Sequence, residues 1–238
     1  MRRNKDTAAI IVAGGKGLRF GGKIRKQYLQ LRGKPILWWS LQAFEKSPSV
    51  GSMVLVVPAE DVRRLRVKAR AWGFRKLAAI VPGGVTRADS VREGLTVVPE
   101  GCRYVAVHDA VRPLVVPAII EQVIAAARRS GAALAACPSK DTVKLANGDG
   151  HIHSTPDREK VWLAQTPQVF HRKLLERAHQ KGKNASVTDD AMLVERLGAK
   201  VRLVEAPADN LKITRPIDLE LAKIILSRGG PCGRPEPF

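Results

Sequence analysis

Glycines and basic side chains alternate directly after the first apolar stretch of the chain, in the segment IIVAGGKGLRFGGKIRKQY at residues 10–28. Glycine allows successive backbone N–H groups to wrap around phosphate oxygens, and lysine and arginine supply the opposite charge. A simple connector has no need of five glycines interleaved with five cations. The pattern therefore predicts a polyphosphate site, in which Arg19 and Lys26 reach the phosphates.

Two common phosphate-binding loops fit this segment only in part. The dinucleotide fingerprint G-x-G-x-x-G begins with Gly15 and Gly17, but Phe20 stands where the third glycine is needed. The P-loop pattern nearly matches from Gly17, but Ile24 replaces the hydroxyl residue that would hold magnesium. What remains is G-G-x-G-x-R followed by K-Q-Y. This pattern resembles the loop of nucleotidyltransferases that join a sugar phosphate to a nucleoside triphosphate.

Further polar motifs extend this resemblance along the chain. They are PGGVTRADSV (82–91), VHDAVRP (107–113), SKDTVK (139–144), DREKVWLAQTPQ (157–168), VTDDA (187–191) and ADNLKITRP (208–216). In this order, from about residue 7 to 226, they resemble the 2-C-methyl-D-erythritol 4-phosphate cytidylyltransferase family of non-mevalonate isoprenoid biosynthesis. The resemblance implies a cytoplasmic homodimer that transfers a cytidylyl group from CTP to methylerythritol phosphate, with Mg²⁺ as cofactor.

The resemblance also implies a role for particular positions. The catalytic cations would be Arg19, Lys26, Arg158 and Lys212; the nucleotide-binding residues Ala13, Gly14, Gly15, Gly17, Gly83 and Ser90; the acceptor-binding residues Arg112, Thr142 and Thr188; and the metal ligand Asp109. Two positions depart from the family pattern. The first loop commonly begins Pro-Ala-Ala-Gly, whereas residues 12–15 are Val-Ala-Gly-Gly, and Val85 stands where an acidic residue is often found. Selection of a pyrimidine would then depend more on the backbone.

The implied reaction needs positioning rather than a general base. A phosphate monoester has a second pKa of about 6, so the attacking oxygen is already ionised at neutral pH. The obstacle is to bring two polyanions together and to stabilise charge on the bridging oxygens. Arginine, lysine and Mg²⁺ placed in advance can do this. The motifs contain no obvious acid–base pair, which agrees with this chemistry.

The elements that must position these residues follow a regular alternation. Apolar runs at 8–13, 53–57, 77–81, 104–107, 132–137, 162–165 and 201–204 predict strands, and amphipathic stretches at 36–46, 61–72, 87–97, 117–130, 172–181, 188–197 and 216–226 predict helices. This order predicts an α/β fold, with a Rossmann-like, mostly parallel sheet and helices on both faces. Motifs that follow strands should meet at the carboxyl edge of the sheet.

The polar segment from about residue 140 to 160 interrupts the alternation. NGDG at 147–150 predicts a tight turn between strands at 142–145 and 151–155. Because a polar hairpin is not stable alone, we expect a protruding dimerisation arm that packs against a second subunit. The resemblance implies that this arm adds residues to the partner's site. We expect one domain over residues 1–228 and a disordered Gly- and Pro-rich tail over 229–238.

Composition and charge limit the remaining functions. The 238 residues carry 41 Lys and Arg against 22 Asp and Glu, a net charge of +19. This charge motivates an alternative, a basic nucleic-acid-binding protein on the same fold, but dispersed cations and 5% aromatic residues favour at most non-specific binding. A ribitol 5-phosphate cytidylyltransferase is the nearer alternative, since it differs mainly in the acceptor pocket.

Several smaller expectations complete the interpretation. No apolar run approaches the roughly 18–20 residues of a membrane span, and the start of the chain predicts an uncleaved N-terminus. Three distant cysteines favour a reducing compartment. We expect no fused second enzyme, since little chain remains beyond residue 226. His108 should be a packed residue, His151 and His153 arm surface rather than a zinc site, and Thr188 a helix N-cap.

Overall fold

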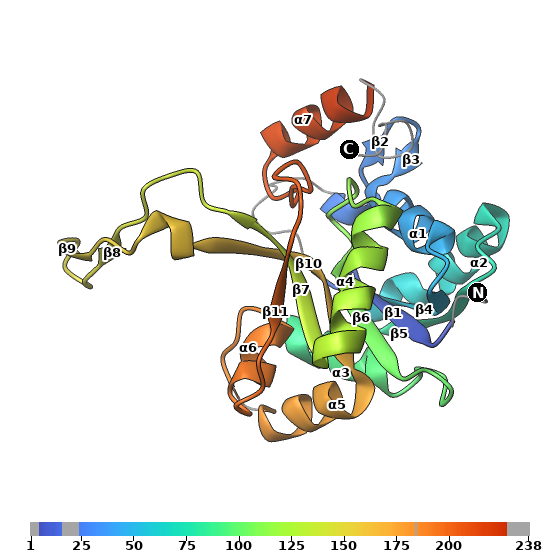
Figure 1. The fold of residues 1–238 in the computed structure, drawn as a ribbon. Helices are drawn as coiled ribbons and strands as arrows, with labels where there is room; N and C mark the ends of the chain where they lie inside the picture. Colours follow the sequence, from blue (N-terminus) through green and yellow to red (C-terminus); the bar gives the residue numbers. More distant parts are fainter. Residues whose placement is uncertain (1–4, 16–23, 184, 228–238) are drawn as a thin grey trace.

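The computed structural model describes residues 5–15, 24–183 and 185–227 (Figure 1). Gly17 and Arg19 of the predicted phosphate loop lie outside the described residues, and so does the predicted tail. Seven strands form one sheet in the order β11-β7-β10-β6-β1-β4-β5. Their bounds are β1 Thr7–Val12, β4 Val50–Val57, β5 Leu77–Pro82, β6 Tyr104–Asp109, β7 Ala132–Pro138, β10 Trp162–His171 and β11 Arg202–Glu205.

All strand pairs of this sheet are parallel except those of β10, which runs antiparallel to β6 and to β7. The prediction of a mostly parallel sheet is therefore confirmed. Successive residues of β1 enter opposite cores: Ala9 and Ile11 pack on one face, and Ala8 and Ile10 on the other. A strand covered on both faces needs apolar side chains at nearly every position, which is why it appears in the sequence as an unbroken apolar run.

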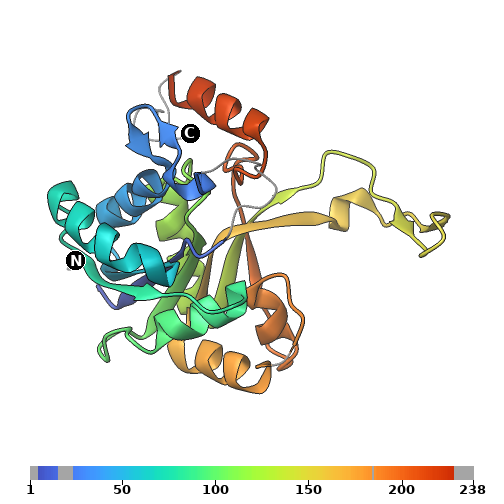
Figure 2. The same cartoon turned by 180° about the vertical axis from the view of Figure 1, so that it is seen from behind.

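Helices cover both faces of the sheet (Figures 1 and 2). One core contains residues of α1 (Ile36–Lys46), α2 (Val62–Trp72) and α4 (Pro117–Ser130). The other contains residues of α3 (Arg87–Leu95), α5 (Arg172–Lys181) and α6 (Asp190–Glu195). Pro117 begins α4 and Gly131, with φ of 83°, ends it, as the sequence predicts. Among the described residues, none of the helices combines the length and apolarity that crossing a membrane requires.

The last helix, α7 (Pro216–Ser227), packs with a small two-stranded hairpin formed by β2 (Gln30–Leu31) and β3 (Lys34–Pro35). Together with residues that follow β6, they form a third apolar cluster, which includes Leu31, Val111, Ile213 and Ala222. This hairpin could not be predicted from the sequence, because two-residue strands leave no periodicity to detect. The cluster thus packs the residues that follow β6 against the segment that precedes α7.

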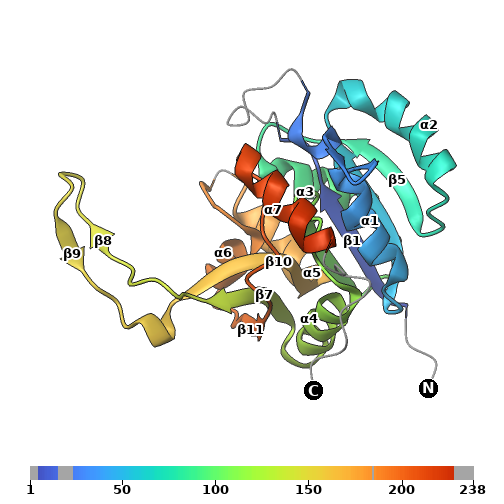
Figure 3. The same cartoon turned by 90° about the horizontal axis from the view of Figure 1, so that it is seen from above.

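The segment from about residue 140 to 160 forms a hairpin that projects from the body, whereas its expected role in dimerisation stays a prediction (Figures 1 to 3). Its paired strands are β8 (Leu145–Ala146) and β9 (Ile152–Ser154), which are shorter than predicted. The turn between them is closed by a hydrogen bond from the N–H of Gly150 to the carbonyl of Asn147 at 3.1 Å. Nearly every arm side chain is exposed.

Two further elements differ from prediction. β10 continues to His171 rather than ending at Gln165, because Gln165, Thr166 and Gln168 are buried and hydrogen-bonded inside the protein. Polar residues in the sequence had indicated a loop there. α6 begins at Asp190, and its N-cap is Asp189, whose carboxylate accepts the N–H of Met192 at 3.0 Å. The prediction that Thr188 caps this helix is wrong, because Asp189 is the residue three positions before that N–H.

Candidate active site

Two of the predicted nucleotide loops meet at the end of β4. Ala13, directly after β1, donates its N–H to the carbonyl of Val56 at 2.7 Å. Gly83, directly after β5, donates its N–H to the carbonyl of Val57 at 2.8 Å. Because β1, β4 and β5 are parallel neighbours, their carboxyl ends lie at one edge and both loops emerge side by side.

Ser90 fills the space beside these two loops. A Cβ atom on Gly83 would stand 2.8 Å from the Ser90 Oγ, and one on Gly14 would stand 3.3 Å from it. The Ser90 hydroxyl donates to the carbonyl of Thr86 at 3.0 Å, and the residue is buried. The structure thus brings three predicted nucleotide-binding residues together, and a side chain at Gly83 would displace Ser90.

The K-Q-Y motif returns the first loop to the body of the protein. Gln27 is buried and donates its side-chain amide to the carbonyl of Ala13 at 2.7 Å. Tyr28 donates its hydroxyl to Asp61 Oδ2 at 2.8 Å, and Arg25 pairs with the same carboxylate at 2.9 Å. Burial first, and then the hydrogen bond to Asp61, raise the pKa of Tyr28, so the hydroxyl stays protonated. Gln27 and Tyr28 therefore anchor the segment that contains Lys26.

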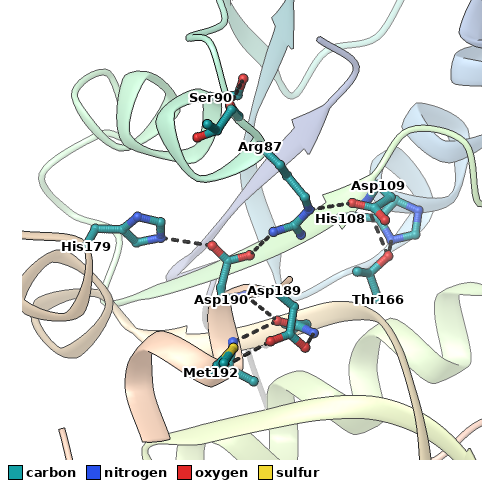
Figure 4. A network of polar contacts seen from close by, with 12 residues as sticks. Arg87, Ser90, His108, Asp109, Thr166, His179, Asp189, Asp190 and Met192 are labelled. Carbon is teal, nitrogen blue, oxygen red and sulfur yellow. Dashed lines mark hydrogen bonds and ion pairs between the residues drawn. The ribbon is translucent and has the colours of Figure 1, made fainter. Parts of the chain in front are cut away.

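Asp109, the last residue of β6, lies between two cations, Arg87 and Lys212, the first of which Figure 4 shows beside it. Its Oδ1 is 2.9 Å from Arg87 Nε, and its Oδ2 is 2.7 Å from Lys212 Nζ. Burial alone would raise the pKa of this carboxyl group, but the charges of Arg87 and Lys212 outweigh burial and hold it well below its usual range. Asp109 is therefore ionised at neutral pH. The structure also brings together Asp109 and Lys212, which the sequence predicted separately as metal ligand and catalytic cation.

Arg87 is not among the site residues predicted from the sequence, although it lies within the motif PGGVTRADSV. This arginine is the first residue of α3, and its Nη1 reaches Asp190 Oδ2 at 2.6 Å while its Nε binds Asp109. A cation in the first turn of a helix opposes the helix dipole. This unfavourable placement is the sequence feature that could have indicated a carboxylate partner for Arg87.

The segment that contains Lys212 is held by residues after β6 and on β10. Arg112 donates to the carbonyl of Asn210 at 2.8 Å, and the Asn210 side chain donates to Gln165 Oε1 at 2.8 Å. The N–H of Ile213 donates to the carbonyl of Val111 at 2.9 Å. Arg112, predicted to contact the acceptor, is in this structure a support for the Lys212 segment.

His108 is the packed residue that the sequence predicted. It is fully buried, its ring lies 5.0 Å from that of Phe44, and its Nε2 donates to the carbonyl of Arg112 at 3.2 Å. The Thr166 hydroxyl then donates to Nδ1 at 2.9 Å. Burial lowers the pKa of His108 to about 3, so the imidazole is neutral. It supports the end of β6 just before Asp109.

The remaining predicted residues do not converge on Asp109 within this chain. Thr142 and Arg158 lie in the projecting arm, where Arg158 Nη1 donates to the carbonyl of Lys140 at 3.4 Å. His151 and His153 are also on the exposed arm, and His151 pairs with Asp149 at 3.3 Å. Thr188 is exposed just before α6.

The donor set at this edge fits Mg²⁺ only together with phosphate. Within residues 5–15, 24–183 and 185–227, no group of three or more His, Cys, Asp or Glu side chains could hold a metal ion. Mg²⁺ commonly binds one or two protein carboxylates and completes its six oxygen ligands with substrate phosphates and water. The ionised Asp109 beside a glycine-rich loop offers one such carboxylate.

Known proteins resemble this chain over nearly its whole length. The family described as 2-C-methyl-D-erythritol 4-phosphate cytidylyltransferase matches residues 7–228. A protein of that name from Alkaliphilus oremlandii is 42% identical, over 95% of this chain and 97% of the relative. One from Pelotomaculum thermopropionicum is 46% identical, over 92% and 93%. The crystal structure of 4-diphosphocytidyl-2C-methyl-D-erythritol synthase from Anaerococcus prevotii superposes with a TM-score of 0.84 at 31% identity, over 94% and 97%.

Proposed function

Because the chain belongs to the 2-C-methyl-D-erythritol 4-phosphate cytidylyltransferase family, we propose how its own residues carry out the reaction of that family. The enzyme transfers the cytidylyl group of CTP to 2-C-methyl-D-erythritol 4-phosphate, releases pyrophosphate and forms 4-diphosphocytidyl-2-C-methyl-D-erythritol. The observation that carries the assignment of residues is the Asp109 carboxylate, which lies between Arg87 and Lys212 at the carboxyl edge of the sheet. Two glycine-containing loops meet at the same edge.

The chemical step is a displacement at the α-phosphorus of CTP. An oxygen of the acceptor's phosphate forms a bond to this phosphorus, the bond to the bridging oxygen breaks, and its electron pair leaves with pyrophosphate. Lys212 lies beside Asp109 and stabilises the negative charge on the α-phosphate oxygens as the bond forms. Lys26 and Arg19 stabilise charge on the triphosphate from the first loop. No general base is needed, because the attacking phosphate is already ionised.

CTP binds across the two loops that flank β4. The backbone of Ala13, Gly14, Gly15 and Gly17 wraps the triphosphate, and Gly83 and Ser90 contact the cytidine. The close approach of Ser90 to Gly83 supports this arrangement, since it leaves little room for a side chain at position 83 and keeps the backbone of this loop close to Ser90. The departure at Val85, whose side chain is fully exposed, agrees with a base selected by the backbone.

Asp109 is the residue that would hold Mg²⁺. When bound, the ion neutralises phosphate charge and orients the triphosphate. Asp109 suits this role because it is ionised and its two carboxylate oxygens face Arg87 and Lys212 at the carboxyl edge of the sheet. Lys212, which contacts Oδ2 of Asp109, would exchange from this carboxylate to the α-phosphate oxygens of CTP.

The enzyme works as a homodimer in which each arm completes the partner's site. Leu145 and Ile152 support this proposal, because these apolar arm side chains remain 50% and 63% exposed within the described part of the chain. Thr142 and Arg158 of the arm, together with Thr188 and Arg112 of the body, hold the acceptor. Residues 1–228 act as one nucleotidyltransferase domain. A cytoplasmic location agrees with the free thiols of Cys102 and Cys137.

Release of pyrophosphate tests this function. The assay contains Mg²⁺ and either methylerythritol phosphate or ribitol 5-phosphate as acceptor, with CTP, UTP, ATP or GTP as donor. We expect release with CTP and methylerythritol phosphate, and its loss in a Lys26→Ala variant. A clear preference for ribitol 5-phosphate would keep the mechanism and change the acceptor. Absence of pyrophosphate release with both acceptors would contradict the proposal.

A further inference from the structure

We propose that Arg87 is a positioning residue whose guanidinium, fixed by Asp190, holds the Asp109 carboxylate in place while Lys212 exchanges between Asp109 and the bound ligand. This inference rests on the role proposed above for Asp109, and it adds three residues, Arg87, Asp190 and His179, that the family motifs did not assign. The contacts that support it join α3, α5 and α6 to the end of β6 (Figure 4).

Arg87 connects two carboxylates from separate elements. Its Nε lies 2.9 Å from Asp109 Oδ1 on β6, and its Nη1 lies 2.6 Å from Asp190 Oδ2 on α6. The guanidinium is planar and its donors have fixed directions, so one arginine can orient two carboxylates with respect to each other. The compact ammonium group of a lysine lacks this fixed fork. Arg87 therefore ties the orientation of Asp109 to the position of α6.

Asp190 is itself immobilised. Its side chain is 1% exposed, and its Oδ1 lies 2.9 Å from His179 Nε2 on α5. The backbone N–H of Asp190 donates to Gln168 Oε1 at 3.2 Å, and Gln168 Nε2 donates to Asp189 Oδ2 at 2.8 Å. Asp190, the second carboxylate partner of Arg87, is thus held by contacts with α3, α5 and β10. A guanidinium held in this way has a single orientation toward Asp109.

Lys212 binds the other oxygen of Asp109, and it is more exposed and less constrained than Arg87. Its side chain is 39% exposed, against 24% for Arg87, and it comes from a loop rather than from a helix. A phosphate group that enters the site can compete for Lys212, whereas Arg87 is retained by the buried Asp190. Oδ2 is therefore the oxygen that becomes available to a ligand, and Oδ1 stays bound to Arg87.

The matched variants are Asp190→Asn and Arg87→Lys. The first keeps the shape of the side chain but removes the charge that retains Arg87, and the second keeps the charge but loses the fork. The measurement is the Kd for Mn²⁺ in the presence of CTP and without acceptor. Electron paramagnetic resonance quantifies the free Mn²⁺ at each concentration. We expect each variant to raise the Kd for Mn²⁺ about 10–100-fold, as loss of a partner that orients a metal ligand does.

Asp6→Asn is the control for a purely structural effect. Asp6 is also buried and pairs with Arg103 and Arg128, but it precedes β1 and so belongs to the opposite edge of the sheet. We expect this variant to lower the Tm and to leave the Kd for Mn²⁺ unchanged. Asp109→Asn is the reference for loss of the metal ligand itself.

The outcomes separate the inference from the function on which it rests. If Asp109→Asn weakens Mn²⁺ binding and both Asp190→Asn and Arg87→Lys bind as the wild type does, the positioning role is wrong and the role of Asp109 stands. If Asp109→Asn binds Mn²⁺ normally, the metal role of Asp109 and this inference both fall, while pyrophosphate release by the wild type still tests the function. Should Asp190→Asn fail to fold, Arg87→Lys decides.

Discussion

The Oγ of Ser90 lies 2.8 Å from the point where a Cβ atom on Gly83 would stand. Real Cβ atoms essentially never approach another heavy atom so closely, so this position admits only glycine unless Ser90 moves. Ser90 cannot easily move, because it is buried on α3 and its hydroxyl is bound to the carbonyl of Thr86. The loop after β5 and the first turns of α3 are therefore fitted to each other.

This contact predicts the behaviour of Gly83→Ala. The added methyl group should destabilise the protein by about 1–3 kcal/mol, the usual range for overpacking, and should raise the KM for CTP because the loop is displaced. Ser90→Ala removes the clashing oxygen, so the double variant should recover much of the lost Tm. Thermal unfolding of the wild type and the three variants measures the Tm. Equal Tm values for the double variant and for Gly83→Ala would show that the clash lies elsewhere.

Lys212→Ala should impair the chemical step more than binding of CTP. Its charge acts on oxygens whose negative charge increases in the transition state, so we expect kcat to fall about 10²–10³-fold with a small change in the KM for CTP. Lys200→Ala removes an exposed lysine that lies on neither loop and should keep wild-type kinetics. Steady-state pyrophosphate release measures both. If the two variants have equal kcat values, Lys212 has no part in the reaction.

Asp6 should give the protein a stability that depends on acid pH. Burial would raise the pKa of Asp6, but hydrogen bonds and charge from Arg128 and Arg103 outweigh burial and lower it. A carboxyl group with a lowered pKa in the folded state contributes stability that is present above its ordinary pKa and is lost as the pH falls through the folded value. The contribution of Asp6 is therefore complete near neutral pH and declines below about pH 4.

The measurement compares the wild type with Asp6→Asn. At pH 7 we expect the variant to lose about 1–3 kcal/mol of unfolding free energy, the scale of hydrogen bonds to charged groups. The difference should shrink as the pH falls below about 4, because the wild type then protonates Asp6 and loses the same interactions. Urea unfolding at a series of pH values measures it. If the difference in unfolding free energy does not change with pH, Asp6 is not the source of the pH-dependent stability.

The net charge of +19 predicts weak, salt-sensitive binding to nucleic acid. Binding that depends on release of counterions weakens steeply as salt increases. We expect a duplex DNA to bind at about 50 mM salt and to be released near physiological ionic strength, without preference for sequence. Fluorescence anisotropy at several salt concentrations measures this. Tight, sequence-dependent binding at physiological salt would restore the alternative of a nucleic-acid-binding protein.

The sequence predicted those parts of the fold and site that depend on local pattern. The buried strands of the parallel sheet could be found as apolar runs, and Asp109 could be found because it follows one of them. Arg87 could not, because its role depends on Asp109 and Asp190, which are 22 and 103 residues away in the chain. Only the folded arrangement of α3, β6 and α6 shows that one guanidinium serves both.

Two local predictions, the N-cap of α6 and the end of β10, were wrong because distant residues decide these positions. Thr188, Asp189 and Asp190 are all residues that can cap a helix, and the sequence alone does not decide which of them is three positions before a free N–H. The structure selects Asp189 and buries Asp190 against His179. Likewise, Thr166 and Gln168 are polar residues within β10 because His108 and Asp189 are there to bind them. Partners distant in sequence decide these positions.

Mixing two inactive variants tests whether the arm completes the partner's site. Arg158 lies on the arm and Lys212 on the body, so in a shared site the two residues come from different subunits. In a mixed dimer of Arg158→Ala and Lys212→Ala, one site would then contain both substitutions and the other neither. Random exchange of subunits should restore about a quarter of wild-type pyrophosphate release, since about half the dimers are mixed and each has one intact site. If both residues act within one subunit, every site keeps a defect and mixing restores nothing. Sedimentation of each variant checks that dimers form, and a monomer at working concentration would contradict the shared site directly.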